Sequence, residues 1–154
     1  MIKSFEPIKY NKAFDHILTD FFKVCLPESC RTLDINGRHS YYKDIAKHFK
    51  TLRCMFDGEN IIGTVAVSEF NYTSCELKSL LPERYHSMGY GKGLLLKAID
   101  YAKEHGYEKM YLDSLPTSKK AITLYRKTGF SDTEKYNSSE HSDIFMVLDL
   151  KDKF

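Results

Sequence analysis

The hydrophobic positions of this 154-residue chain recur at helical spacing in some segments and at extended spacing in others. Residues 2–7 predict a short strand, and Asn11 is suited to cap the helix that follows. The apolar positions of that helix are Phe14, Ile17, Leu18, Phe21 and Cys25. We expect Pro27 to end this helix, residues 33–38 to form a turn, and a second helix to cover residues 40–49.

The middle of the chain first predicts a β-hairpin. Two strand-like runs within residues 51–70 meet at the turn-forming residues 57–60, which makes them antiparallel neighbours. Another strand over residues 75–81 leads into a glycine-rich loop and a helix, and Gly106 stands where a left-handed C-terminal cap belongs. The apolar face of this helix comprises Leu95, Ala98, Ile99 and Ala102. A strand over residues 109–115 completes a strand–loop–helix–strand unit whose two strands are parallel or splayed.

The last third of the chain predicts one helix and two strands. The helix begins near Thr117 or Ser118 and stops at Gly129. Its core-facing positions are Ala121, Leu124, Tyr125 and Thr128. Residues 130–136 and 143–150 follow as strands around a polar turn. This order of elements predicts a mixed α/β fold, with helices on both faces of a mostly antiparallel sheet.

Length and composition limit the classes of function. A chain of 154 residues fits one domain, over residues 1–154. Its 23 basic and 21 acidic side chains are interleaved, so a net charge of +2 indicates neither a nucleic-acid nor a membrane partner. The N-terminus lacks the apolar segment of a signal peptide, and no run approaches the roughly 18 residues of a membrane span. The cysteines form no C-x-x-C pair, which indicates reduced core thiols and a cytoplasmic protein; they are Cys25, Cys30, Cys54 and Cys75.

Three glycines, Gly89, Gly91 and Gly93, stand between the predicted strand at residues 75–81 and the helix after it. A glycine-rich turn that feeds a helix directs several main-chain N–H groups and the positive end of the helix dipole at one point. A phosphate is the usual ligand of such a turn, because glycines let its oxygens approach the main chain. A tight turn that binds nothing has the same pattern.

The spacing of the motif separates two classes of phosphate ligand. The nucleoside-triphosphate pattern G-x-x-x-x-G-K-[ST] fails at its first and last positions, where His86 and Gly93 stand. A dinucleotide motif keeps two of its three glycines and has Leu94 at the third, with Asp113 near the expected acidic position. The antiparallel strands predicted before the loop argue against that fold, which opens with its glycine motif.

Three segments within residues 76–130 stand together in a characteristic order. They are His86–Gly91, the strand "MYLDSLP" and the helix "SKKAITLYRKTGF". In this order and spacing they resemble the cofactor-binding half of the GNAT superfamily of acetyl-CoA-dependent N-acetyltransferases. The first segment is similar to the family's (Gln/Arg)-x-x-Gly-x-(Gly/Ala) loop, and the third to its Asn-x-x-Ala-x-x-Leu-Tyr-x-x-x-Gly-Phe helix. The N-terminal half matches the family only in its order of elements.

The resemblance implies acetyl-CoA as co-substrate and a splayed parallel strand pair at its site. The residues expected to hold its diphosphate are His86, Ser87, Met88, Gly89, Tyr90, Gly91 and Lys92. Either Leu80 or Leu81 is expected to contact the pantetheine and the thioester. Two positions depart from the family: His86 replaces Gln or Arg, and Ser118 replaces the Asn that binds the pantetheine arm.

The chemistry of amide formation assigns further roles. An amine must be neutral to attack a thioester, yet most primary amines are protonated near pH 7, so a base or a water chain has to remove a proton. The resemblance implies Glu76 as that base, although a charge at the start of a strand can simply face solvent. It implies Tyr125 as the acid that protonates the leaving thiolate, although its spacing also suits packing in the core. The main-chain N–H of Leu81 is the simplest donor to the oxyanion.

The acceptor is expected to be a small-molecule or peptide amine, bound by a monomer or a homodimer. Four aromatic or imidazole side chains either line the pocket of this acceptor or pack on the surface: Tyr41, Tyr42, Tyr136 and His141. No histidines stand at ligand spacing, so no metal is expected. A second hypothesis is a catalytically silent acyl-CoA-binding regulatory module.

Overall fold

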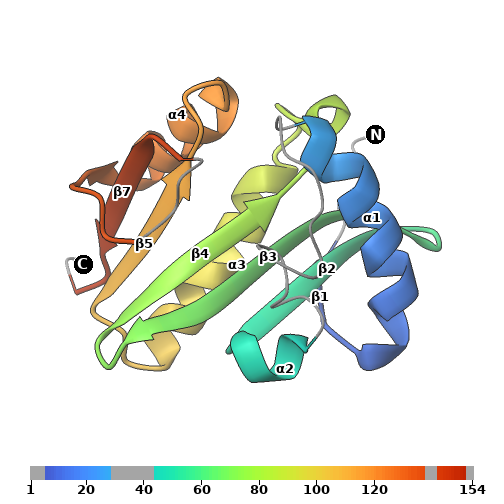
Figure 1. Ribbon diagram of the computed structural model, residues 1–154, viewed down its shortest axis with the longest axis horizontal. Helices are drawn as coiled ribbons and strands as arrows, with labels where there is room; N and C mark the ends of the chain where they lie inside the picture. Colours follow the sequence, from blue (N-terminus) through green and yellow to red (C-terminus); the bar gives the residue numbers. More distant parts are fainter. Residues whose placement is uncertain (1–5, 29–43, 138–141, 152–154) are drawn as a thin grey trace.

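The computed structural model describes residues 6–28, 44–137 and 142–151. Among these residues the strands form one seven-stranded sheet in the order β1-β2-β3-β4-β5-β7-β6, shown in Figure 1. The strands are β1 (Ile8–Lys9), β2 (Thr51–Asp57), β3 (Asn60–Asn71), β4 (Ser74–Leu80), β5 (Lys109–Ser114), β6 (Ser131–Asp132) and β7 (Ile144–Asp149). The helices are η1 (Lys12–Phe14), α1 (Asp15–Glu28), α2 (Ile45–His48), η3 (Glu83–Tyr85), α3 (Tyr90–Glu104) and α4 (Lys119–Thr128). Every neighbouring pair is antiparallel except β4 and β5, which are parallel.

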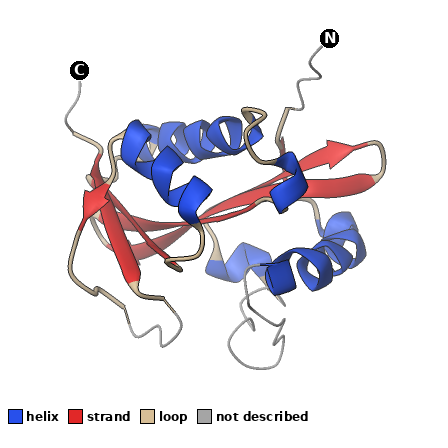
Figure 2. Cartoon of the chain, turned by 90° about the horizontal axis from the view of Figure 1, so that it is seen from above, coloured by secondary structure: helices blue, strands red, loops and turns tan. Residues whose placement is uncertain are grey.

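Helices cover both faces of the sheet, as the sequence predicts (Figure 2). Strand β3 shows why, because its alternate residues enter two different cores. Val65 and Val67 pack with α3 and α4, whereas Ala66 packs with α1 and α2. The predicted apolar face of α3 is completely buried in the first of these cores. A strand buried on both faces has the near-continuous apolar run seen in this part of the sequence.

The parallel strands β4 and β5 separate after a short stretch of pairing. Their register runs from Ser74 opposite Lys109 to Glu76 opposite Tyr111, although β4 continues to Leu80. Beyond this point β4 stays paired with β3 and β5 stays paired with β7. The two strands therefore diverge toward their C-terminal ends, as Figure 1 shows, and the expected splayed pair is confirmed.

Local signals at the ends of the helices have the predicted effect. The Asn11 side chain accepts a hydrogen bond from the Ala13 N–H at 2.9 Å, at the start of η1, which leads into α1. Gly106 and Gly129 have φ of 80° and 119°, in the left-handed region that ends α3 and α4. The hairpin turn also forms as predicted, with Asp57 opposite Asn60.

Four boundaries differ from the sequence prediction. The first helix includes Pro27 and ends one residue later, since a proline in the last turn removes a single hydrogen bond. The strand expected at residues 2–7 forms at Ile8–Lys9, where Cys54 and Arg53 are its register partners; residues 2–5 lie outside the described part.

The second predicted helix is short, because Asp44 caps α2 by accepting from the Lys47 N–H. The first part of its predicted range and the predicted turn at residues 33–38 lie outside the described residues. The strand predicted at residues 130–136 is reduced to Ser131–Asp132, because the chain then leaves the sheet edge so that Tyr136 can reach β4.

The three cysteines in the described residues, Cys25, Cys54 and Cys75, are buried free thiols, and Cys30 lies outside the described part. Burial raises the pKa of Cys54 and of Cys75 to about 12 in each case. Within the residues that the structure describes, no helix combines the length and the apolar character that crossing a membrane requires.

Candidate active site

The loop between β4 and α3 turns the chain back over the end of β4. Ser87 and Gly89 have φ of 66° and 87°, so two residues of the loop are left-handed. Gly89 is the N-cap of α3, and the first bond within the helix runs from the Gly93 N–H to the Gly89 carbonyl at 3.1 Å. The N–H groups of the first turn therefore point out of the N-terminal end of α3. Ser87, Met88 and Gly89 are exposed there.

The three glycines at and after the start of α3 differ in what a side chain would meet, and only Gly89 and Gly91 have a structural reason. Gly89 needs its left-handed φ, although a Cβ there would meet no atom within 4 Å. At Gly91 a Cβ would lie 3.3 Å from Leu124 Cδ2 and 3.7 Å from Leu81 Cδ2, so this glycine allows close packing of α3 against α4 and the end of β4. At Gly93 a Cβ would meet open space.

His86 ties the loop to the residue that follows β4. Its Nε2 lies 2.8 Å from the Leu81 carbonyl oxygen, and because a carbonyl only accepts, the imidazole donates. Leu81 also fills space left by Gly63 on β3, where a Cβ would lie 3.0 Å from Leu81 Cδ1. Sequence reasoning identified neither contact, since Gly63 stands inside an unremarkable apolar run.

The remaining predicted cofactor residues lie at the end of β4 and at the starts of α3 and α4. Leu80 is the last residue of β4, Tyr90 and Lys92 begin α3, and Lys92 is exposed. Ser118 is the N-cap of α4, but its side chain makes no capping hydrogen bond; its main-chain N–H donates to Leu115.

Tyr125 lies on α4 and is 9% exposed. It belongs to the core formed with α3, and its ring centroid lies 5.7 Å from that of Phe130. Cys75 and Leu77 belong to the same core, so Glu76, which stands between them on β4, points to the opposite face of the sheet. Tyr125 and Glu76 are therefore on opposite faces.

Glu76 does not project freely into solvent, since its side chain is 16% exposed and has several partners. The Tyr136 hydroxyl donates to Glu76 Oε2 at 2.6 Å, and Asn137 Nδ2 lies 3.2 Å from the same oxygen. Lys78 Nζ lies 3.5 Å from Glu76 Oε1. Burial, and then the Glu76 charge and hydrogen bond, raise the pKa of Tyr136 well above its usual range, so this phenol remains a donor.

A second carboxylate belongs to the same network. Asn137 Nδ2 donates to Asp113 Oδ2 at 2.6 Å, and the buried Ser142 hydroxyl donates to Asp113 Oδ1 at 2.7 Å. Asp113 thus turns toward the segment between β6 and β7, and we refer to Glu76, Asp113, Tyr136 and Asn137 as the carboxylate network. The sequence suggested Tyr136 only as a residue lining the acceptor pocket or packing on the surface, and Tyr41, Tyr42 and His141 lie outside the described residues.

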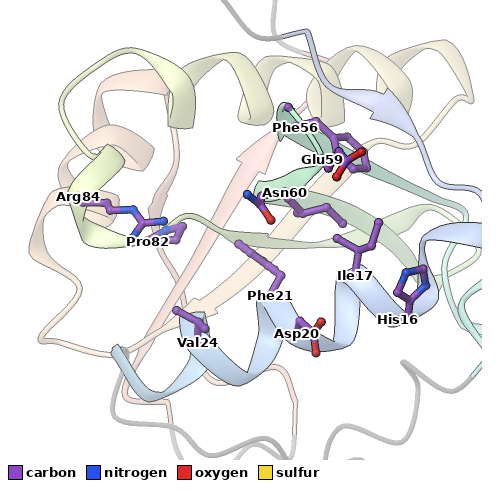
Figure 3. A pocket seen from close by; sticks show the side chains of 12 residues that line it. His16, Ile17, Asp20, Phe21, Val24, Phe56, Glu59, Asn60, Pro82 and Arg84 are labelled. Carbon is purple, nitrogen blue, oxygen red and sulfur yellow. The ribbon is translucent and has the colours of Figure 1, made fainter.

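A pocket lies beside this site and is drawn in Figure 3. It lies between α1, the tip of the β2–β3 hairpin and the residues just after β4, and has a volume of about 660 Å³. Phe21, Asn60 and Arg84 represent these three walls. None of the predicted cofactor residues lines it. No group of three or more potential metal-ligand side chains was found in the described part of the chain.

A family model described as the acetyltransferase (GNAT) family matches residues 11–130. The chain belongs to the GNAT acetyltransferase family. An uncharacterised N-acetyltransferase from Schizosaccharomyces pombe is 39% identical over 77 residues, which are 49% of this chain and 47% of that protein. YobR, an uncharacterised N-acetyltransferase from Bacillus subtilis, is 30% identical over 105 residues, or 65% of this chain and 42% of that protein. The matches thus span less than half of each of these relatives.

Solved structures share this GNAT fold over nearly the whole chain. A GNAT-family acetyltransferase from Staphylococcus aureus Mu50 superposes with a TM-score of 0.86 at 20% identity, covering 96% of this chain and all of that one. The structure of yncA from Salmonella typhimurium with its cofactor acetyl-CoA has a TM-score of 0.73 at 17% identity, with coverages of 99% and 97%. PaiA N-acetyltransferase from Thermoplasma acidophilum, in complex with coenzyme A, has a TM-score of 0.73 at 16% identity, with coverages of 96% and 99%. At these identities the similarity establishes the GNAT fold.

Proposed function

We propose that this chain transfers an acetyl group from acetyl-CoA to the amine of a small-molecule or peptide acceptor. The observation that carries the proposal is the divergence of β4 from β5 next to the N-terminal end of α3, in a chain of the GNAT family. A thioester can lie between diverging strands whose facing main-chain groups are not paired with each other. The neighbours described with acetyl-CoA or coenzyme A support this cofactor.

The loop residues fit a diphosphate. Ser87 and Gly89 shape an exposed turn, and the N–H groups of Gly91 and Lys92 begin a helix of 15 residues, whose dipole favours an anion. The Lys92 ammonium adds a positive charge beside the loop. The pantetheine arm would follow Leu80 or Leu81, and Ser118, at the start of α4, is the other residue proposed to bind it.

Acetyl-CoA supplies an activated acetyl group as a thioester, and the side chains of this protein handle the protons. Glu76 accepts a proton from the attacking amine, directly or through a water molecule, as the nitrogen–carbon bond forms. The main-chain N–H of Leu81 donates to the oxyanion. The carbon–sulfur bond then breaks, and Tyr125 donates its hydroxyl proton to the leaving thiolate. Because Tyr125 and Glu76 lie on opposite faces of the sheet, a thioester between β4 and β5 would separate the acid from the base.

The alternative is a catalytically silent acyl-CoA-binding regulatory module. One observation favours it: Glu76 already has three hydrogen-bonding or ionic partners, as a purely structural carboxylate would. In that case the chain would bind acetyl-CoA without releasing thiol in the presence of any amine.

An acceptor screen that follows thiol release from acetyl-CoA tests the proposal. We expect turnover with at least one class of amine, and a fall in kcat of roughly 10²-fold or more in Tyr125→Phe, within the usual range for a general acid. The Kd for acetyl-CoA should stay near the wild-type value, because the ring remains in its core position. Acetyl-CoA binding without turnover across small amines, amino acids, polyamines and peptides would favour the regulatory module.

A further inference from the structure

The chain after β6 returns over the sheet face that carries Glu76. Glu76 and Tyr111 are the last register pair between β4 and β5, and Asp113 follows on the same face of β5. The carboxylate network therefore lies where the two strands begin to diverge. Tyr136 and Asn137 come from a segment about 60 residues further along the chain, and both donate to Glu76.

Asn137 joins the two strands through a single nitrogen atom. Its Nδ2 lies 3.2 Å from Glu76 Oε2 and 2.6 Å from Asp113 Oδ2, and an amide nitrogen has two hydrogens to donate. Ionised carboxylates such as Glu76 and Asp113 can only accept hydrogen bonds. The amide nitrogen of Asn137, and not its amide oxygen, must therefore face them. The bridge offsets the repulsion between the two carboxylates.

The same arrangement distinguishes the two oxygens of Glu76. Tyr136 and Asn137 both engage Oε2, whereas Oε1 lies beside Lys78. Within the described residues, the charged groups that these interactions bring to Glu76 and its network are Lys78 on its own strand and Asp113 on β5. A carboxylate held through one oxygen presents the other in a fixed direction.

We infer that Tyr136 and Asn137 are positioning residues that hold Glu76 with Oε1 directed to receive the proton of the acceptor amine. This assignment rests on the proposed function, in which Glu76 is the base. Neither residue needs to touch the substrate. Their effect should therefore appear in the rate of proton removal and not in the binding of acetyl-CoA.

Tyr136→Phe is the cleanest variant, because it removes the donor and keeps the ring. The ring packs against Tyr111, Phe70 and Phe145, with centroids 4.8, 5.3 and 5.8 Å away. We expect kcat to fall about tenfold or more, because the variant loses a hydrogen bond to a charged group. The Kd for acetyl-CoA should be unchanged. Asn137→Ala should act in the same direction, and Asn137→Gln, which keeps the amide, should restore part of the loss.

Tyr107→Phe is the matched control. The Tyr107 hydroxyl donates to Glu69 Oε1 at 2.8 Å. This variant therefore also removes a hydrogen bond between a tyrosine and a glutamate, but one that lies outside the carboxylate network. Its kcat should equal that of wild type. If Asn137→Ala fails to fold, Tyr136→Phe still decides the question.

A double-mutant cycle between Tyr136→Phe and Glu76→Gln completes the test. If Tyr136 acts through Glu76, the double variant should have nearly the same kcat as Glu76→Gln alone. Wild-type kcat in Tyr136→Phe, or losses that multiply in the double variant, would overturn the assignment and leave the proposed function intact. A wild-type chain that releases no thiol with any acceptor would instead refute the proposed function, and the positioning role with it.

Discussion

Gly89→Ala tests whether the proposed diphosphate binding depends on the left-handed turn before α3. Gly89 has a φ of 87°, and a Cβ at this position would contact nothing within 4 Å, so the cost of alanine is conformational. A left-handed alanine costs roughly 1–2 kcal/mol. The lower entropy of the unfolded chain offsets roughly 0.4–1 kcal/mol of this. We therefore expect a net loss of about 1 kcal/mol in the free energy of unfolding, which lowers Tm by about 2–4 °C in a protein of this size.

Two further glycines, Gly93 inside α3 and Gly106 just after its C-terminal end, provide controls. Gly106, with a φ of 80° and open space around its Cβ position, should show the same loss of stability at the other end of the helix. Gly93 lies inside α3, has no positive φ, and would also place a Cβ in open space. Gly93→Ala should therefore stabilise the protein by roughly 0.5–1 kcal/mol, because alanine loses less backbone entropy than glycine in a helix.

The assay has two parts, thermal unfolding without ligand and calorimetric titration with acetyl-CoA. Gly89→Ala should weaken acetyl-CoA binding severalfold, because strain at residue 89 reorients the N–H groups of the loop, whereas Gly106→Ala should bind like wild type. Two results would refute this reasoning. One is a Gly89→Ala protein as stable as wild type, and the other is an equal loss of acetyl-CoA affinity in Gly89→Ala and Gly106→Ala.

Two further predictions concern His86 and the buried cysteines. His86→Ala should raise the Kd for acetyl-CoA by about two- to tenfold, because it removes a hydrogen bond to Leu81 of ordinary net strength. His86→Gln keeps a donor and should therefore bind acetyl-CoA more tightly than His86→Ala. Equal affinities in the two variants would exclude this role. The raised pKa of Cys54 and Cys75 should contribute stability that is fully present below the ordinary thiol value of 9.0 and is lost as pH rises toward about 12. Urea unfolding midpoints at pH 8 and pH 10 check the sign, and a Cys54→Ala/Cys75→Ala double variant should show a smaller decrease between these pH values than wild type.

Local patterns in the sequence predicted the elements whose causes are also local. The hairpin at Asp57–Asn60 and the helix stops at Gly106 and Gly129 depend on turn chemistry within a few residues, and all three form as expected. The apolar face of α3 was also predicted correctly, because the residues that recur at helical spacing are the ones that the helix buries. The parallel pairing of β4 with β5 followed from the strand–loop–helix–strand order.

Contacts between distant segments had no comparable signal. Gly63 makes room for Leu81 across two strands, and this depends on the register of β3 with β4, which periodicity does not specify. Strand β6 is shorter than the strand predicted over residues 130–136, because Tyr136 forms a hydrogen bond with Glu76 on β4 instead of extending the pairing with β7.

The carboxylate network shows how this limit affects the assignment of Glu76. From the sequence, Glu76 is either a base or a charge at the start of a strand that faces solvent, and neither interpretation identifies its partners. In the structure its environment is set mainly by Tyr136 and Asn137, residues about 60 positions away, and by their link to Asp113. A base and a structural anchor are consequently compatible in one side chain, because the oxygen that anchors the segment after β6 differs from the oxygen beside Lys78. The partners of Glu76 resemble those of a structural carboxylate when they are only counted, but they are compatible with catalysis once its two oxygens are distinguished, and the kinetic cycle with Tyr136 separates the two roles.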